Sequence, residues 1–212
     1  ERLRILHGVD RAIIAGESSE AIVAALVGPL RKLLDAPRVM VGVIDDAVEE
    51  VRWLAVAGLD AASPGPELRS PLHALGDLAS LQRGEPQQID GPALETRPGL
   101  SALANADTGA HLIVPMLAGG QLIGVVCLTG ASRAFPQEQV QIGEEAAVQI
   151  AIAIAHARMI ERIAQQQAFL RQVIDLDRNL IFAKDRDGRY TLANQAVAEA
   201  YGTTVEQLIG RT

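Results

Sequence analysis

The residue types most able to do chemistry are scarce in this chain: it has one cysteine and four histidines. Cys127 lies inside the apolar run 122–128, where a thiol is expected to be an inert part of the core. One cysteine can form neither an internal disulfide nor a cysteine-rich metal site. No Ser–His–Asp constellation, clear carboxylate pair or phosphate-cradling glycine loop is recognisable. The sequence therefore predicts a protein that is not an enzyme, with no catalytic residue and no metal site.

The composition narrows the function classes further. The chain has 212 residues, of which 49% are hydrophobic and 21% charged, as in ordinary globular proteins. A net charge of −7 argues against a nucleic-acid partner. The longest apolar run falls short of the roughly 20 residues of a membrane span, and no N-terminal signal is visible. Together with the single cysteine, these features predict a cytoplasmic protein.

A β-hairpin is predicted at the centre of the chain. Gly119-Gly120 lies in the short segment between the apolar runs 112–117 and 122–128, which is a strong hairpin signal. Both runs are apolar at nearly every position, so these strands are expected to be covered on both faces. A second strand pair is predicted at 38–44 and 51–57, after helices at 1–16 and about 18–34.

Two long connections, 58–71 and 92–108, are the expected place of a binding site or a lid. Alternatively, the two connections are loose surface insertions without a binding role. Between them a short helix at 72–82 and a short strand at 87–89 are predicted. If a pocket forms there, its predicted lining is Trp53, His73, Leu78, Arg97, Asp107 and His111.

Trp53 and the two histidines of this predicted lining also have a plainer interpretation. Trp53 is more often simple core, because burial of a large aromatic side chain is itself stabilising. Haem would need an axial histidine on the pocket wall, and only His73 and His111 lie near the predicted pocket. Histidines at such places are usually hydrogen-bonded structural residues. His7 and His156 are on predicted helices and are expected to face a partner helix or solvent.

A very long helix is predicted from 136 to about 174, roughly 55–60 Å at 1.5 Å per residue. Its first half is apolar nearly all round, whereas its second half narrows to a stripe in which residues recur in steps of four and three. That spacing favours a two-stranded coiled coil. The alternative is a helix that packs back on its own domain. We expect a homodimer through the N-terminal helix and this connecting helix, with Ile152, Met159, Ile163, Leu170 and Val173 on the dimer helix.

The pattern restarts after residue 175. Residues 180–183 and 190–193 are predicted strands, Asp187-Gly188 marks the turn between them, and short helices follow at 194–201 and 203–210. A segment of this size rarely folds without help, so it looks like part of a larger domain.

Several of these residues carry a family resemblance. Residues 1–160 resemble a GAF domain, and the matching features are Leu54-Ala55-Val56-Ala57-Gly58, Gly84-Glu85-Pro86, Val114-Pro115-Met116-Leu117, Leu122-Ile123-Gly124-Val125-Val126 and Phe135. From about 167, the chain resembles the first part of a PAS domain, through Asn179-Leu180-Ile181-Phe182, Lys184-Asp185-Arg186-Asp187-Gly188-Arg189-Tyr190, Ala193-Asn194, Tyr201-Gly202 and Leu208-Ile209-Gly210.

The resemblance implies an α+β fold, with a GAF-like antiparallel sheet and flanking helices at 1–160, a connecting helix at 161–175 and a partial PAS-like segment at 176–212. It also implies a sensory module of a bacterial signalling protein, of the histidine kinase or diguanylate cyclase type. The output domain would lie outside these residues. The alternatives are a ligand-free spacer and, less favoured, a small-molecule enzyme on the GAF scaffold.

Known GAF chemistries fit these residues poorly. Methionine sulfoxide reductases of this fold need more than one cysteine. The usual Cys-His pair of bilin-binding domains is absent, since Leu128 follows Cys127. The residue set of many cyclic-nucleotide-binding GAF domains is not recognisable, and His156 stands where many GAF domains have asparagine. The cofactor, if there is one, is therefore left unknown.

Overall fold

The structure is a computed structural model of the 212-residue chain, and it describes residues 18–45, 47–58, 68–90, 93 and 109–212. The chain divides into two compact units, Glu1–Arg158 and Met159–Thr212. Each unit has hydrophobic core residues of its own. The helix predicted at 1–16 lies outside the described residues.

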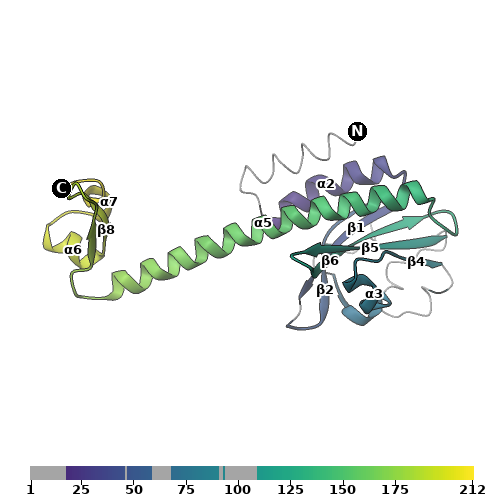
Figure 1. Cartoon of the computed structure of the whole chain (residues 1–212), viewed down its shortest axis with the longest axis horizontal. Coiled ribbons are helices and arrows are strands. Elements are labelled where there is room, and N and C mark those ends of the chain that lie inside the picture. Colours follow the sequence, from purple (N-terminus) through teal and green to yellow (C-terminus); the bar gives the residue numbers. More distant parts are fainter. Residues whose placement is uncertain (1–17, 46, 59–67, 91–92, 94–108) are drawn as a thin grey trace. The chain divides into compact units, whose positions relative to one another are not determined.

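A six-stranded antiparallel sheet organises the first unit (Figure 1). Its strands are β1 (Arg38–Asp45), β2 (Glu50–Ala57), β3 (Arg69–Pro71), β4 (Gln87–Asp90), β5 (Ala110–Ala118) and β6 (Gln121–Gly130). They are arranged in the order β3-β2-β1-β6-β5-β4, and all neighbouring strands are antiparallel. The predicted hairpin is the β5–β6 pair, and the predicted pair at 38–44 and 51–57 is β1–β2. These strands confirm the predicted antiparallel α+β fold.

Helix α2 (Ser19–Leu33) and the first half of α5 (Gln137–Leu176) cover one face of the sheet (Figure 1). Val39, Val41 and Val43 of β1 belong to the core on this face, whereas Met40 and Ile44 belong to the core on the opposite face. Both faces of the strand are therefore buried. This explains why β1 is apolar at nearly every position instead of alternating with polar residues.

The opposite face is covered by a 3₁₀ turn, η1 (Leu72–Leu75), and a short helix, α3 (Leu78–Gln82). The prediction of one continuous helix at 72–82 was therefore wrong. Gly76 adopts a φ of 105°, a left-handed conformation that ends η1, and Asp77 then caps α3. We call this side of the sheet the α3 face.

Residues 68–71 also depart from the sequence prediction, which assigned a loop to 58–71. Arg69–Pro71 forms the edge strand β3, paired with Glu50–Arg52 of β2. Its sequence, Arg-Ser-Pro, has no β-branched residue, so nothing local identifies it as a strand. Pro71 is tolerated because β3 is at the sheet edge.

The second unit contains a two-stranded sheet of β7 (Phe182–Lys184) and β8 (Tyr190–Ala193), followed by α6 (Gln195–Ala200) and α7 (Val205–Leu208). Asn194 is fully buried and links this unit's segments. Its amide group donates to the carbonyls of Ile174, Asp177 and Asn179, and its side-chain oxygen accepts from the backbone N–H of Ile181 and Val197. The bond from Val197 makes Asn194 the N-cap of α6, the helix predicted to begin at residue 194.

Candidate ligand-binding site

Trp53 and His111 both lie on the α3 face of the sheet. Trp53 of β2 is 0% exposed, and its indole Nε1 donates to Ser70 Oγ of β3 at 3.0 Å. Its ring packs in a core that includes Leu75 of η1, Leu81 of α3 and Cys127 of β6. Trp53 therefore fills space between the sheet and its cover, with its one polar atom satisfied.

His111 is the second residue of β5 and is 4% exposed. It pairs with Thr129 of β6, which in turn pairs with Arg38 of β1. Residues that pair directly across antiparallel strands point to the same face. Arg38, Thr129 and His111 therefore form one buried row across three strands, which we call the polar row.

Burial is the main influence on the charges of the polar row. Burial, followed by the charge of Arg38, lowers the pKa of His111 to about 4. Burial also lowers the pKa of Arg38 from its usual value, although an arginine stays protonated at neutral pH. The imidazole is thus neutral at neutral pH, and its Nε2 has no hydrogen-bond partner among the described residues.

Leu78 lies elsewhere, in a cleft at the other end of the strands. The cleft has a volume of about 310 Å³ and is lined by Ile44, Leu72, Leu78, Gln82, Gly120, Gln121 and Leu122. These residues come from the end of β1, from η1 and α3, and from the tip of the β5–β6 hairpin. Neither Trp53 nor His111 lines this cleft.

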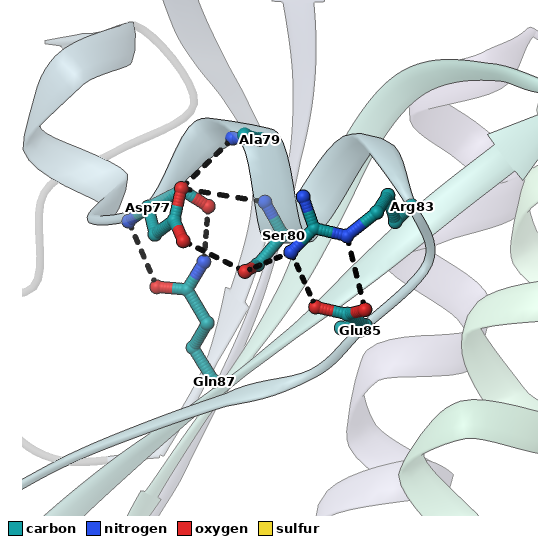
Figure 2. A network of polar contacts seen from close by, with 6 residues as sticks. All are labelled: Asp77, Ala79, Ser80, Arg83, Glu85 and Gln87. Carbon is teal, nitrogen blue, oxygen red and sulfur yellow. Dashed lines mark hydrogen bonds and ion pairs between the residues drawn. The ribbon is translucent and has the colours of Figure 1, made fainter.

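A network of polar contacts fixes the helix that presents Leu78 (Figure 2). Asp77 accepts hydrogen bonds from the backbone N–H groups of Ala79 and Ser80 and, at 2.7 Å, from the Ser80 hydroxyl. The bonds from Ser80 and Ala79 hold the pKa of Asp77 below its usual value. Gln87 of β4 accepts from the Asp77 backbone N–H and donates to the Asp77 carbonyl. The start of α3 is therefore tied to the sheet.

The remaining predicted pocket residues are dispersed. His73 is exposed on η1, outside the lining of the cleft and outside the polar row. Arg97 and Asp107 lie outside the described residues. The structure thus places Trp53 and His111 on the same face of the sheet, on β2 and β5 with β1 and β6 between them, and it places Leu78 and His73 apart from both.

Sequence reasoning missed Arg38 and Thr129 as partners of His111. An arginine at the start of an otherwise apolar strand was the available signal, because a buried charge in such a position needs a reason. The pairing itself depends on the register of three strands that are far apart in the sequence.

The predicted dimer-helix residues are all exposed on α5 of the isolated chain: Ile152, Met159, Ile163, Leu170 and Val173. By contrast, Ala147, Ile150 and Ile154 of the same helix are fully buried in the core that the first unit's sheet shares with α2. Exposed large apolar side chains in a repeated pattern mark a surface that is available for contact.

Cys127 is buried, and burial raises the pKa of its thiol to about 12. The thiolate, the form needed for nucleophilic attack, is therefore strongly disfavoured at neutral pH. Among the residues that the structure describes, no group of three or more His, Cys, Asp or Glu side chains could hold a metal ion. No described helix combines the length and the apolar character needed to cross a membrane.

Comparisons with known proteins agree with this architecture. Residues 18–154 match the family model for the GAF domain, and residues 174–212 match a model for the PAS fold. A comparison with curated protein sequences finds no match.

Solved GAF domains are similar in structure. A phycoerythrobilin-bound GAF domain from a cyanobacterial phytochrome has a TM-score of 0.62 at 15% identity, covering 76% of this chain and 98% of that one. The GAF domain of a phosphoenolpyruvate-protein phosphotransferase from Coxiella burnetii has a TM-score of 0.60 at 26% identity, covering 76% and 96%. Residues 122 to 287 of a methyl-accepting chemotaxis protein have a TM-score of 0.58 at 19% identity, covering 74% and 98%.

The family match spans more than half of the chain, and the antiparallel sheet between two helices and the α3 cover is the fold of those structures. This chain therefore belongs to the GAF domain family.

Proposed function

We propose that this chain is a sensory module in which the GAF domain binds a small ligand and α5 relays that event through a homodimer. The observation that carries the proposal is the exposed apolar stripe on α5, a helix whose first half is buried against the sheet. A ligand can drive such a relay only if it prefers one of two arrangements of the helices.

Similar proteins support a signalling role. The structures similar to this chain include parts of a phytochrome and of a methyl-accepting chemotaxis protein. A PAS-fold match at 174–212 follows the GAF match at 18–154, and α5 spans the residues between the two matches. The output domain that we propose is of the histidine kinase or diguanylate cyclase type and lies outside this chain.

The stripe has the spacing of a coiled-coil seam. Met159, Ile163, Leu170 and Val173, with Gln166 between them, recur in steps of four and three residues. Side chains at this spacing line one side of a helix and pack against the same side of a second helix. The partner that fits the stripe is a second copy of α5, whose stripe is identical.

Light scattering of the 212-residue chain tests the dimer. We expect a dimer at micromolar concentration, and a monomer when Leu170 or Ile163 is replaced by Asp, because a buried unpaired carboxylate is strongly unfavourable. The matched control is Gln165→Asp, which places the same side chain on the same helix but outside the stripe. A monomeric unmodified chain, or equal effects of all three substitutions, would contradict the relay.

A structural spacer without a ligand is the second candidate. It is favoured by the dense packing around Trp53, where Leu75, Leu81 and Ile113 are almost completely buried. Native mass spectrometry and an absorbance spectrum of the purified protein separate the two functions. Extra mass or a visible band supports a sensor, whereas a colourless protein of the mass of its chain, with no metabolite that raises its melting temperature, supports a spacer.

An enzyme on this scaffold is the least supported function. The buried Cys127 has a pKa raised to about 12, so the thiol is not poised for nucleophilic attack. The same burial disfavours Cys127 as an attachment point for a chromophore. We therefore propose recognition without covalent chemistry.

A further inference from the structure

The polar row crosses three adjacent strands on the face of the sheet that does not contact α2 and α5. Arg38, Thr129 and His111 are 4%, 5% and 4% exposed. Adjacent strands are about 4.8 Å apart, so the backbones at the two ends of the row are separated by about 10 Å. The three side chains are therefore near neighbours on one face of the sheet.

Apolar packing alone does not account for this row. Polar side chains are rarely buried to this degree, and a buried polar atom without a hydrogen-bond partner is rarer still in native proteins. Nε2 of His111 is such an atom, because none of the described residues hydrogen bonds to it. Buried orphan groups of this kind are candidates for contact with a ligand.

The chemistry of the three side chains selects the ligand. A guanidinium has only donors, and their fork matches the geometry of a carboxylate or phosphate. The Thr129 hydroxyl can donate, and His111 can donate from Nε2 once it is protonated or in the matching tautomer. A cation is disfavoured by the charge of Arg38. That charge already acts on His111, where it adds to burial in lowering the imidazole pKa.

We propose that Arg38, Thr129 and His111 form a binding site for the anionic group, a carboxylate or a phosphate, of a small ligand. The site rests on the proposed sensory function and gives it a chemical class of signal. Arg38 supplies the positive charge, Thr129 a hydrogen bond in the middle of the row, and His111 a second donor. The anion would hydrogen bond to Nε2 of His111, for which the described part of the chain offers no partner.

The test uses the 212-residue chain, with succinate and inorganic phosphate as probes and succinamide as the neutral analogue of succinate, all at constant ionic strength. The readout is the set of imidazole NMR signals of the four histidines. We expect a saturable shift of the His111 signals with at least one anionic probe and none with succinamide, while His7, His73 and His156 do not respond. Response to succinate alone indicates a carboxylate ligand, and response to phosphate alone a phosphorylated one.

Substitutions identify the site. Arg38→Gln is expected to weaken anion binding at least ten-fold, because it removes a charge-assisted hydrogen bond. Arg69→Gln is the matched control: Arg69 is on β3, is exposed and forms an ion pair with Glu50, so binding should be unchanged. Thr129→Val, which keeps the shape of the side chain, is a milder variant should Arg38→Gln fail to fold, and it should also weaken binding.

Three results would overturn the site: no response of His111 to either anion, an equal response to succinamide, or the same affinity in the wild type and in the folded Arg38 or Thr129 variant. Light scattering of the same samples reports on the relay separately. A chain that dimerises but binds no anion would refute the anion site and leave the dimeric relay standing. A monomer that binds succinate would do the reverse.

Discussion

Gly42 of β1 lies directly beneath the indole ring of Trp53, its partner across the β1–β2 pair. A Cβ at position 42 would approach the ring carbon Cε3 to 2.9 Å and Val51 Cγ1 to 2.5 Å. Real Cβ contacts are almost never so short, so the glycine makes room for the aromatic side chain.

Gly42→Ala is therefore expected to destabilise the protein by about 1–3 kcal/mol, the usual result of overpacking a core. Urea unfolding followed by circular dichroism measures the loss. Gly143→Ala on α5 is the control, since its Cβ would meet Leu128 and Val114 at an ordinary 3.4 Å. There alanine should stabilise by about 0.5–1 kcal/mol through its helix propensity. Equal stabilities of the two variants would show that the contact at Gly42 is relaxed in solution.

Ser70→Ala tests the hydrogen bond of Trp53. The substitution leaves the indole N–H buried without an acceptor, which should lower the free energy of unfolding by about 1–3 kcal/mol. Ser80→Ala removes a hydroxyl of the same kind from the exposed network around Asp77 and should have a smaller effect. A larger loss of unfolding free energy in Ser80→Ala than in Ser70→Ala would contradict the predicted contribution of the Trp53–Ser70 hydrogen bond.

Stability should fall as the pH is lowered from about 6.5 to 4, because of His111. The folded pKa is about 4 and the ordinary value is 6.5, so below 6.5 the unfolded chain binds a proton that the folded chain does not. The resulting loss in the free energy of unfolding amounts to about 3 kcal/mol once the pH reaches 4, and it vanishes well above pH 6.5.

His111→Gln should flatten this part of the pH profile of the unfolding free energy. His156→Gln is the control, because His156 is exposed on α5. A profile that keeps its slope in the His111 variant would assign the acid sensitivity to other groups.

Cys127 should not react with thiol reagents in the folded protein at neutral pH, since burial raises its pKa to about 12 and excludes the reagent. In urea one thiol per chain should react at the rate of an ordinary cysteine. Labelling kinetics with a chromogenic disulfide measure both. Rapid stoichiometric labelling of the folded chain would contradict the buried position of the thiol.

Asn194→Asp should unfold or strongly loosen the second unit. The change replaces an NH₂ group that faces three backbone carbonyls with an oxygen that can only repel them when ionised. Gln207→Glu is the control, because its oxygen still accepts from the Thr203 hydroxyl. Amide hydrogen exchange over 177–212 would measure the effect, and unchanged protection in the Asn194→Asp variant would argue against this hub.

The parts of the fold that follow from local sequence were predictable. Gly119-Gly120 identifies the β5–β6 hairpin, a β-branched run identifies β1, and the predicted partner strand at 51–57 matches β2 to within a residue. The strand β3 was not predictable, because Arg69–Pro71 is a strand only through its pairing with β2. The break at Gly76 has a local signal, a glycine followed by a capping aspartate, which the helical pattern of 72–82 concealed.

The candidate site was predictable in part. His111 is conspicuous as a histidine at the start of an apolar strand, and Leu78 does line a cleft. The role of Arg38 depends on Thr129 lying between it and His111, which is a matter of register across β1, β6 and β5. Long-range register of this kind has no signature in any single segment.

The hydrogen bond between Trp53 and Ser70 also has a practical consequence. Trp53 is the only tryptophan in the chain, so the intrinsic emission of the protein excited at the red edge of its absorption comes from a single known ring. That ring belongs to the same buried core as Cys127 of β6. Cys127 is two residues before Thr129, the middle residue of the polar row. Unlabelled protein thus carries its own optical reporter on the face where ligand recognition is proposed.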